Sequence, residues 1–463
     1  MQRNRALPRL VERPGKGAGA KLGVDMIQTI DLRELRPGAA ELTALLPRPT
    51  VDISVAMTAA KDLIDEVRSG GESALREHAR RFDGGEPESV RVSAEDIEAA
   101  VEALDPAVRA ALEVAIERVR RASAAQVPES RVTELTADSR IVQRWQPVDR
   151  VGLYVPGGKA VYPSSVIMNV IPAQVAGVGS LALASPAQRD FGGSVHPVVL
   201  GAAGLLGVTE VYAIGGASAI GALAYGIPEI GLEPVDIVTG PGNIYVAAAK
   251  RLVKGQVGID SEAGTTEILV IADEHANPTY VAADLISQAE HDEAAASLLV
   301  TDSAEFAERV RAELERQSQT TTHSARVVQA LGGPQSAIVL VADLAAAARF
   351  SNAYGPEHLE IQTASNAEVL ADITSAGAIF VGEHSPVSLG DYLAGSNHVL
   401  PTGGQSRFSA GLGAATFLRP QQIIEYGPTG LEEVAAGIRA LSDAEALPAH
   451  GDAVAIRFTP SAK

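Results

Sequence analysis

A glutamine and a histidine lie three residues apart in the stretch SQAEHDE, residues 287–293, near the end of an expected helix. Side chains at this spacing share one face of a helix, so Gln288 and His291 can reach the same ligand. Imidazole nitrogen and amide oxygen both suit a divalent metal ion. A polar helix end in contact with solvent is the simpler interpretation, and the pair alone leaves the two open.

A carboxylate and an imidazole are adjacent in NAYGPEHLEI, at Glu357 and His358. Pro356 disfavours a helix at the residue before it, so we expect the pair at the start of a short helix or turn. Neighbours on a helix diverge by about 100°, which would let the two groups address two sides of a substrate. Both groups can accept a proton, and their resting pKa values differ. A surface glutamate beside a capping histidine is the alternative.

Two later segments add polar side chains. SLGDYLAGSNHVLPTGG places Asp391 and His398 in a loop rich in glycine and serine, and EALPAHGDAV places Glu445 and His450 near the C-terminus. Because the chain has no cysteine, any metal must be held by nitrogen and oxygen ligands. A mixed set that suits zinc or another divalent first-row metal would comprise Gln288, His291, Asp391 and His450. These residues are scattered along the chain, so their spacing does not establish a site.

Three glycine-rich turns are candidates for an anion or nucleotide site. They read YVPGGKAVYPSS (residues 154–165), IGGASAIGALAYG (214–226) and TGPGNIYVAAAK (239–250), and each follows an apolar run and precedes an expected helix. Small residues let backbone amides approach a phosphate, and a helix N-terminus favours its negative charge. None matches the GxGxxG dinucleotide pattern, so an anion or nucleotide site and ordinary tight turns are both open.

The elements that would position these residues alternate between strand and helix. Short apolar runs separate helical segments from residue 151 onward, first VGLYV, SLALAS, EVYAIGG and VDIVTGPGN, then TEILVIAD, SLLVTD, SAIVLVAD and AIFVG. This alternation predicts two α/β units, each with a parallel sheet covered by helices. Residues 53–124 have apolar side chains at helical spacing and predict a structural helical region. Ligands of open parallel sheets bind beyond the carboxyl ends of the strands, so we expect the site there.

Length and charge narrow the class of protein. A chain of 463 residues exceeds a single hydrophobic core, so we expect two to four domains. The net charge of −19 argues against binding to nucleic acid or an anionic membrane, since both are polyanions. No run approaches 18 apolar residues, and the N-terminus lacks the apolar core of a secretory signal. We therefore expect a cytoplasmic protein whose residues 1–25 form a disordered extension.

Five blocks of sequence together resemble the histidinol dehydrogenase family: RVGLYVPGGKAVYPSSVIMNV, TGPGNIYV, ADLISQAEHDE, PEHLEI and GDYLAGSNHVLPT. The resemblance runs from IDLRE, near residue 30, to the C-terminus. It implies a four-electron alcohol and aldehyde dehydrogenase that takes L-histidinol through L-histidinaldehyde to L-histidine. Two NAD would be reduced in each turnover, at the end of histidine biosynthesis.

The resemblance also implies a domain layout. We expect two Rossmann-like parallel-sheet domains, an N-terminal helical region and a small C-terminal helical arm. After the extension, the expected boundaries are 26–145 for the mainly helical N-terminal region, 146–262 for the first Rossmann-like domain (the NAD side), 263–412 for the second (the metal and the catalytic pair), and 413–463 for an arm exchanged in a homodimer.

Individual residues receive roles from the same resemblance. One zinc ion per subunit would be held by Gln288, His291, Asp391 and His450, the last supplied by the other subunit of the homodimer. His358 would take the proton of the hydroxyl from which hydride leaves, and Glu357 would activate the water that hydrates the aldehyde. The substrate would contact Thr266, Gln288, His291, His358, Asp391, Glu445 and His450. NAD would contact Tyr154, Ser218 and Asn243.

The sequence departs from the usual family pattern in a few places. Ser218 stands where glutamine is usual, which removes an amide that could reach the cofactor. Thr266 keeps a hydroxyl but lacks the usual preceding proline, and Gln405 and Gly413 also differ. These changes bear on cofactor affinity, and they leave the metal set and the adjacent bases intact.

Other functions are open. A relative in the same superfamily could oxidise another small polar alcohol, such as a sulfonated diol, with the same zinc, bases and NAD. Glu445, which suits an ammonium or imidazole group, favours histidinol. A metal- or solute-binding protein would need export and would leave Glu357 and His358 idle, and the glycine-rich turns argue against a zinc hydrolase.

Overall fold

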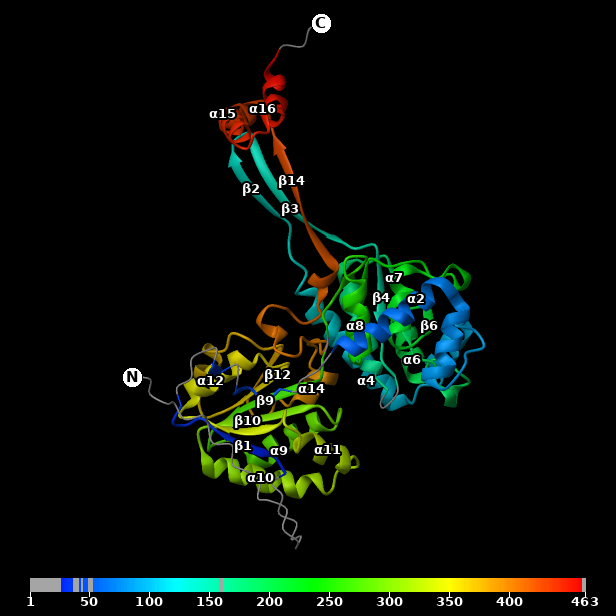
Figure 1. Cartoon of the computed structure of the whole chain (residues 1–463), viewed down its shortest axis with the longest axis vertical. Coiled ribbons are helices and arrows are strands. Elements are labelled where there is room, and N and C mark those ends of the chain that lie inside the picture. Colours follow the sequence, from blue (N-terminus) through cyan, green and yellow to red (C-terminus); the bar gives the residue numbers. More distant parts are fainter. Residues whose placement is uncertain are drawn as a thin grey trace.

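The computed structural model describes residues 26–35, 41–42, 45–48, 53–157, 161–262 and 264–459. The expected extension, residues 1–25, lies outside the described residues. Two α/β units lie against each other, and a slender arm projects away from both (Figure 1). In the part of the chain that the structure describes, no helix is long and apolar enough to cross a membrane.

A five-stranded parallel sheet forms the centre of the first unit, in the order β6-β5-β4-β7-β8. Its strands are β4 (Arg150–Tyr154), β5 (Ser180–Ser185), β6 (Val211–Ala213), β7 (Ile237–Thr239) and β8 (Gly258–Ile259). Successive residues of a strand face opposite sides, so Leu183 packs into one hydrophobic cluster and Ala184 into another. Both faces are buried, which explains why uninterrupted apolar runs mark these strands.

Helices cover both faces of this sheet. One face carries α3 (Ala94–Glu102), α4 (Pro106–Ala124), α5 (Pro163–Ala176) and α6 (Pro197–Leu205). The other carries α2 (Ile53–His78), α7 (Gly216–Tyr225) and α8 (Ile244–Val253). Short helical turns are η1 (Ala79–Asp83), η2 (Arg189–Phe191) and η3 (Pro228–Ile230). Proline begins α4, α5 and α6, at a position where its missing N–H costs no helical hydrogen bond.

The second unit contains a six-stranded parallel sheet in the order β1-β11-β10-β9-β12-β13. Its strands are β1 (Gln28–Asp31), β9 (Glu267–Ala272), β10 (Ala296–Thr301), β11 (Ala337–Leu340), β12 (His358–Gln362) and β13 (Ala378–Val381). One face packs against α9 (Pro278–Ala289), α10 (Ala304–Ser318), α11 (Ser324–Leu331) and α14 (Val387–Tyr392). The other packs against α12 (Leu344–Tyr354) and α13 (Asn366–Ala371). The expectation of two parallel-sheet α/β units is confirmed.

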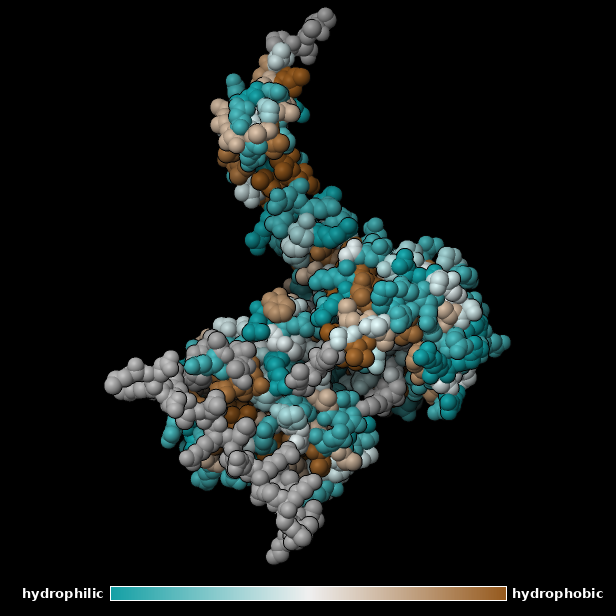
Figure 2. Space-filling model, viewed as in Figure 1, coloured by the Kyte–Doolittle hydropathy of each residue, from teal (hydrophilic) through white to brown (hydrophobic). Residues whose placement is uncertain are grey.

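The arm is antiparallel at its base and helical at its end. Its three strands pair in the order β14-β3-β2, and they are β2 (Arg131–Thr136), β3 (Ser139–Pro147) and β14 (Leu418–Tyr426). Beyond them lie α15 (Pro428–Ala444), α16 (Pro448–Ala455) and η6 (Ile456–Phe458). Figure 2 shows hydrophobic residues gathered at this helical end, where Leu441 is 67% and Ile456 is 69% exposed. Within residues 26–145, β1 thus belongs to the six-stranded sheet and β2 and β3 to the arm.

Candidate active site

The polar side chains with chemical potential gather where the strands of the six-stranded sheet begin. His358 is the first residue of β12, and it pairs in register with Ile268 near the start of β9. Helix α9 follows β9 and runs back along the sheet, so its C-terminal end, with Gln288, lies at the same edge. The candidate residues of this sheet therefore lie at its amino edge, and not beyond the carboxyl ends of the strands, where we expected the site.

The placement of Glu357 and His358 also differs from the expected short helix or turn. The residue before Pro356, Gly355, ends α12 in a left-handed conformation with φ 58°. The chain then enters β12, which is hydrogen-bonded to β9 on one side and β13 on the other. Pairing with two neighbouring strands decides the conformation here, and the local signal from proline does not reveal it.

A chain of hydrogen bonds joins the amide of α9 to the carboxylate beside β12. The Nε2 of Gln288 donates to Oγ1 of Thr266 at 2.5 Å, and Thr266 donates to Oε2 of Glu357 at 2.6 Å. The backbone N–H of Glu267 donates to the same oxygen at 3.0 Å. Thr266 and Glu357, far apart in sequence, are therefore held together by the pairing of β9 with β12.

The orientation of His358 follows from its neighbours. Its Nδ1 lies 3.3 Å from the carbonyl oxygen of Glu267, which can only accept, so Nδ1 carries the proton and donates. Nε2 is then the lone-pair nitrogen, free to take a proton. Oε2 of Glu357 lies 3.6 Å from Nδ1, on the same side of the ring.

Burial sets the proton affinity of both groups. It raises the pKa of the Glu357 carboxyl to about 7, and the hydrogen bonds from Thr266 and Glu267 oppose the shift. Burial lowers the pKa of His358, and the nearby carboxylate of Asp391 opposes that shift. Near neutral pH His358 is mostly neutral, and Glu357 gains and loses a proton readily. Both states suit general-base chemistry.

One atom of this site lacks a partner. Oε1 of Gln288 is buried and accepts no hydrogen bond from any described residue, although Nε2 of the same amide is bonded. A buried acceptor without a partner is costly, so it marks a place where a cation or donor fits. Charges on His291 and Asp391 act on the pKa of Glu357, so both residues lie in its neighbourhood. An amide oxygen, an imidazole and a carboxylate together fit a zinc ion.

Two predicted site residues lie far in space from the others. Glu445 and His450 are exposed at the helical end of the arm, far from α9 and β12 (Figure 1). Among the described residues, no three histidine, cysteine, aspartate or glutamate side chains form a metal-binding group. A single copy of the chain thus brings together Gln288, His291 and Asp391 without His450.

His398 belongs to the site, although the sequence analysis gives it no role. Its Nδ1 donates to the carbonyl oxygen of Asp391 at 2.9 Å, and Nε2 lies 3.3 Å from Oγ of Ser165. Burial lowers the pKa of His398, and the charge of Asp391 opposes the shift. Since Ser165 belongs to α5 of the first unit, His398 lies at the junction of the two units. Its position in the loop GSNHVLPT beside Asp391 was the available signal.

The residues expected to contact NAD surround the carboxyl edge of the five-stranded sheet. Tyr154 ends β4, and its hydroxyl accepts a hydrogen bond from the backbone N–H of Gly216 at 3.1 Å. Ser218 in α7 is buried, with Oγ 2.8 Å from Nδ1 of His78. Asn243 is the exposed N-cap of α8, and its side chain accepts from the first turn of that helix. Of the three, Asn243 presents its side chain to solvent.

Comparison with known proteins shows the family of the chain. The model of the histidinol dehydrogenase family matches residues 46–458. The chain is 69% identical to histidinol dehydrogenase of Leifsonia xyli subsp. xyli, over 93% of this chain and 99% of that one. The chain belongs to the histidinol dehydrogenase family. Its relative from Thermobifida fusca is 56% identical over 94% of this chain and 98% of its own.

A solved histidinol dehydrogenase agrees with the fold as well. The crystal structure of the enzyme from Elizabethkingia anophelis covers 94% of this chain and 98% of its own, with a TM-score of 0.88 and 32% identity.

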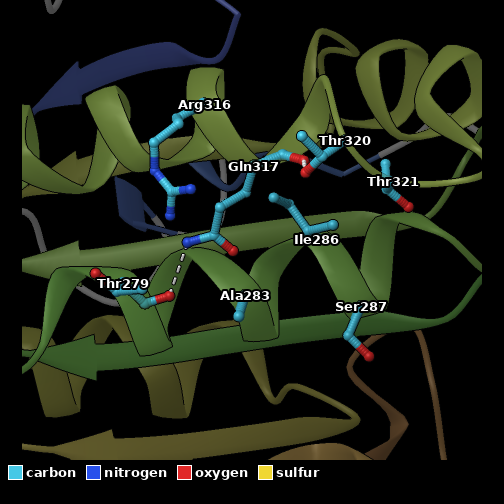
Figure 3. A pocket seen from close by; sticks show the side chains of 8 residues that line it. All are labelled: Thr279, Ala283, Ile286, Ser287, Arg316, Gln317, Thr320 and Thr321. Carbon is cyan, nitrogen blue, oxygen red and sulfur yellow. Dashed lines mark hydrogen bonds between the residues drawn. The ribbon is translucent and has the colours of Figure 1, made fainter.

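In the structure of the present chain, a groove of about 480 Å³ lies between α9 and α10 (Figure 3). Ser287 lines that groove, while the next residue, Gln288, bonds Thr266. The groove therefore lies along a different face of α9 from Gln288.

Proposed function

We propose that the chain is a zinc-dependent histidinol dehydrogenase that works as a homodimer in the cytoplasm. It would oxidise L-histidinol through L-histidinaldehyde to L-histidine and reduce two NAD. The observation that carries the proposal is the hydrogen-bonded chain Gln288–Thr266–Glu357, with an unpartnered amide oxygen at one end and His358 at the other.

Gln288, His291 and Asp391 would hold zinc together with His450 of the partner subunit. Bound there, zinc would supply positive charge that orients the imidazole and amino groups of the substrate. Glu445 of the partner subunit would meet the same polar end of the substrate. The exposure of α16 and the apolar surface around it support an arm that completes a site on a second copy.

His358 and Glu357 divide the proton transfers. Nε2 of His358 takes the proton of the substrate hydroxyl as hydride leaves for NAD, and it does so again for the hydrated aldehyde. Glu357 removes a proton from the water that adds to the aldehyde carbonyl. Thr266 donates to Glu357 and keeps the carboxylate directed into the pocket. The raised pKa of Glu357 lets it hold and release that proton near neutral pH.

NAD would bind over the carboxyl edge of the five-stranded sheet. The N-terminus of α8 follows the turn after β7, and the positive end of its helix dipole suits a pyrophosphate. Asn243 is exposed there, and Tyr154 and Ser218 shape the neighbouring turns. His398 bonds to both units, so the proposed hydride donor and acceptor meet at their junction.

The decisive experiment counts NADH formed per L-histidinol consumed by the zinc-loaded protein. Two NADH per substrate, with L-histidine as the product, is the expected result. One NADH would mean that the aldehyde leaves unoxidised, and no turnover would contradict the proposal. A sulfonated diol in the same assay tests the second candidate, and the exposed Glu445 carboxylate, which suits a cationic substrate, favours L-histidinol.

A subunit-exchange experiment tests the shared site. Chains with His291→Ala and with His450→Ala are each expected to be inactive. A mixed dimer would combine both defects in one site and leave the other site intact, so mixing should restore activity. Absence of recovery after subunit exchange has been verified would mean that all four ligands come from one chain.

A further inference from the structure

Two acidic side chains, one buried and one partly buried, lie in contact beside the candidate site. Glu360, in β12, is 1% exposed, and Asp284, in α9, lies against it. Their carboxyl groups hydrogen-bond to each other. Two ionised carboxylates repel, so this contact requires a proton between them. Burial raises the pKa of both groups, and in Glu360 the neighbouring Asp284 adds to the shift.

Further hydrogen bonds tie the two acids to a third element. The backbone N–H of Val387, the first residue of α14, donates to Oε1 of Glu360 at 3.0 Å. Nε2 of Gln362 donates to Oε2 of Glu360 at 3.0 Å and to Oδ2 of Asp284 at 3.2 Å. The acids therefore connect α9, β12 and α14, which pack together beside the candidate site (Figure 1).

Each of these elements also carries a residue of the candidate site, spaced so that it shares a face of its helix or strand with the residue that takes part in these bonds. On α9, Gln288 follows Asp284 by four residues, one helical turn. On β12, His358 precedes Glu360 by two residues, which is the same side of the strand. On α14, Asp391 follows Val387 by four. A shift at the acids is transmitted directly to a proposed metal ligand or to the proposed base.

We propose that Asp284 and Glu360 act as one positioning pair that sets the separation of Gln288, Asp391 and His358. The inference rests on the zinc site proposed above and assigns two residues that do not touch substrate or metal themselves. Their bond fixes α9 against β12, and the bond from Val387 fixes α14 against both. Side chains that orient metal ligands from behind commonly change metal affinity by about 10–100-fold when removed.

The test compares Glu360→Leu with Glu360→Gln. Leucine keeps the volume but leaves the N–H of Val387 without an acceptor and removes the bond between Asp284 and residue 360. Glutamine keeps an oxygen for Val387 and supplies an N–H to Asp284, and it loses only the bond that Glu360 accepts from Gln362. We expect zinc affinity, measured by competition with a chromogenic chelator, to fall about 10–100-fold in Glu360→Leu and to stay near the wild-type value in Glu360→Gln.

Asp273→Leu is the matched control. Asp273 is also a buried acid of this sheet, and it accepts backbone N–H bonds from His275 at 2.9 Å and Ala364 at 2.8 Å, but it lies at the opposite edge. The Asp273→Leu variant should have a lower melting temperature than the wild type and the same zinc affinity. Equal loss of affinity in Asp273→Leu and Glu360→Leu would overturn the inference, because general destabilisation would then explain both.

Two further outcomes are decisive. Wild-type zinc affinity in Glu360→Leu, or a loss in Glu360→Gln as large as in Glu360→Leu, would overturn the positioning role. If Glu360→Leu does not fold, Asp284→Leu against Asp284→Asn tests the same bond from the less buried side. A wild-type protein that binds no zinc would contradict the proposed function itself, which separates that failure from failure of this inference.

Discussion

The two parallel sheets of this molecule are built alike but carry their candidate binding groups at opposite edges. In the five-stranded sheet, the glycine-rich turns follow β4, β6 and β7, at the carboxyl edge. In the six-stranded sheet, the proposed bases stand at the amino edge, where β9 and β12 begin. A parallel sheet covered by helices therefore does not by itself locate the site, and the groups at each edge must be examined.

Asp273 takes up two backbone N–H groups at the carboxyl edge of the six-stranded sheet. The strand order reverses between β9 and β12, which is where open sheets of this kind usually bind ligands. There the carboxylate of Asp273 accepts the backbone N–H groups of His275 and Ala364. Those N–H groups would otherwise be donors for a ligand. At the amino edge, by contrast, the oxygen of Gln288 is left without a partner.

Two histidines test this contrast with the largest expected effect. His291→Asn should remove bound zinc and with it nearly all turnover, a greater loss than the about 10²–10⁴-fold typical of losing a general base. His275→Asn, at the carboxyl edge, should be neutral because His275 is exposed. Zinc content and NADH formation are the measurements. Normal turnover with full zinc content in His291→Asn would show that the metal does not bind at the amino edge.

The next effect separates the two bases within the amino edge. Glu357→Gln should slow oxidation of L-histidinaldehyde more than the first hydride transfer from L-histidinol, because only the aldehyde needs a water molecule activated. His358→Ala should slow both, since each hydride leaves as an oxygen loses a proton. General-base loss of about 10²–10⁴-fold is large enough to distinguish them.

The measurement is single-turnover NADH formation from each substrate at saturating NAD. An equal loss in both half-reactions for Glu357→Gln would assign the carboxylate a role in positioning His358 instead. The 3.6 Å separation between Oε2 of Glu357 and Nδ1 of His358 is compatible with that second role, so the experiment decides between them.

Much of the fold could be predicted from the sequence because its signals are local. Apolar runs such as SLALAS and TEILVIAD became β5 and β9, and the alternation with helices predicted parallel sheets. Gln288 lies in the last turn of α9, as the helical spacing predicted, but α9 ends at Ala289. His291 follows in a turn, where its N–H donates to the carbonyl oxygen of Gln288 at 3.2 Å, so the predicted helix does not reach His291.

The rest depends on contacts between distant segments. The gathering of the candidate residues at the amino edge could not be predicted, because Thr266 and Glu357 meet only through the pairing of β9 with β12. The strand position of His358 is set by its neighbours on both sides, while the local signal from Pro356 favoured a helix or turn. The distance of His450 from the other ligands follows from β14, which pairs with β3 and carries the C-terminus away.

A smaller effect is expected at the five-stranded sheet, from a buried ion pair below the turn after β7. Nζ of Lys250 donates to Oδ1 of Asp260 at 2.5 Å, and Oδ2 of Asp260 accepts from the N–H of Gly240 at 2.9 Å. Lys250→Met keeps most of the volume but leaves Asp260 buried without its cation. We expect the KM for NAD to rise about tenfold, equivalent to about 1.4 kcal/mol, with zinc content unchanged.

Lys254→Met, an exposed lysine at the end of the same helix, is the control and should leave the KM for NAD unchanged. If Lys250→Met instead lowers zinc affinity with no change in the KM for NAD, the division of labour between the two sheets is wrong. If neither changes, the ion pair has no part in holding the cofactor turn.

The smallest effect concerns two acids, Glu357 at the amino edge and Asp83, the last residue of η1 in the first unit, whose pKa values burial raises to about 7. In the unfolded chain both carboxyls titrate near their ordinary pKa values, so the folded state binds more protons between about pH 4.5 and 7. Stability is therefore lost as pH rises through that window.

In the zinc-free protein, Glu357→Gln and Asp83→Asn should each raise the melting temperature by a few degrees at pH 8 and less at pH 4.5. Zinc should reduce the gain for Glu357→Gln, because a nearby cation favours the carboxylate, and leave that for Asp83→Asn unchanged. An equal response of both variants to zinc would place the metal away from the amino edge.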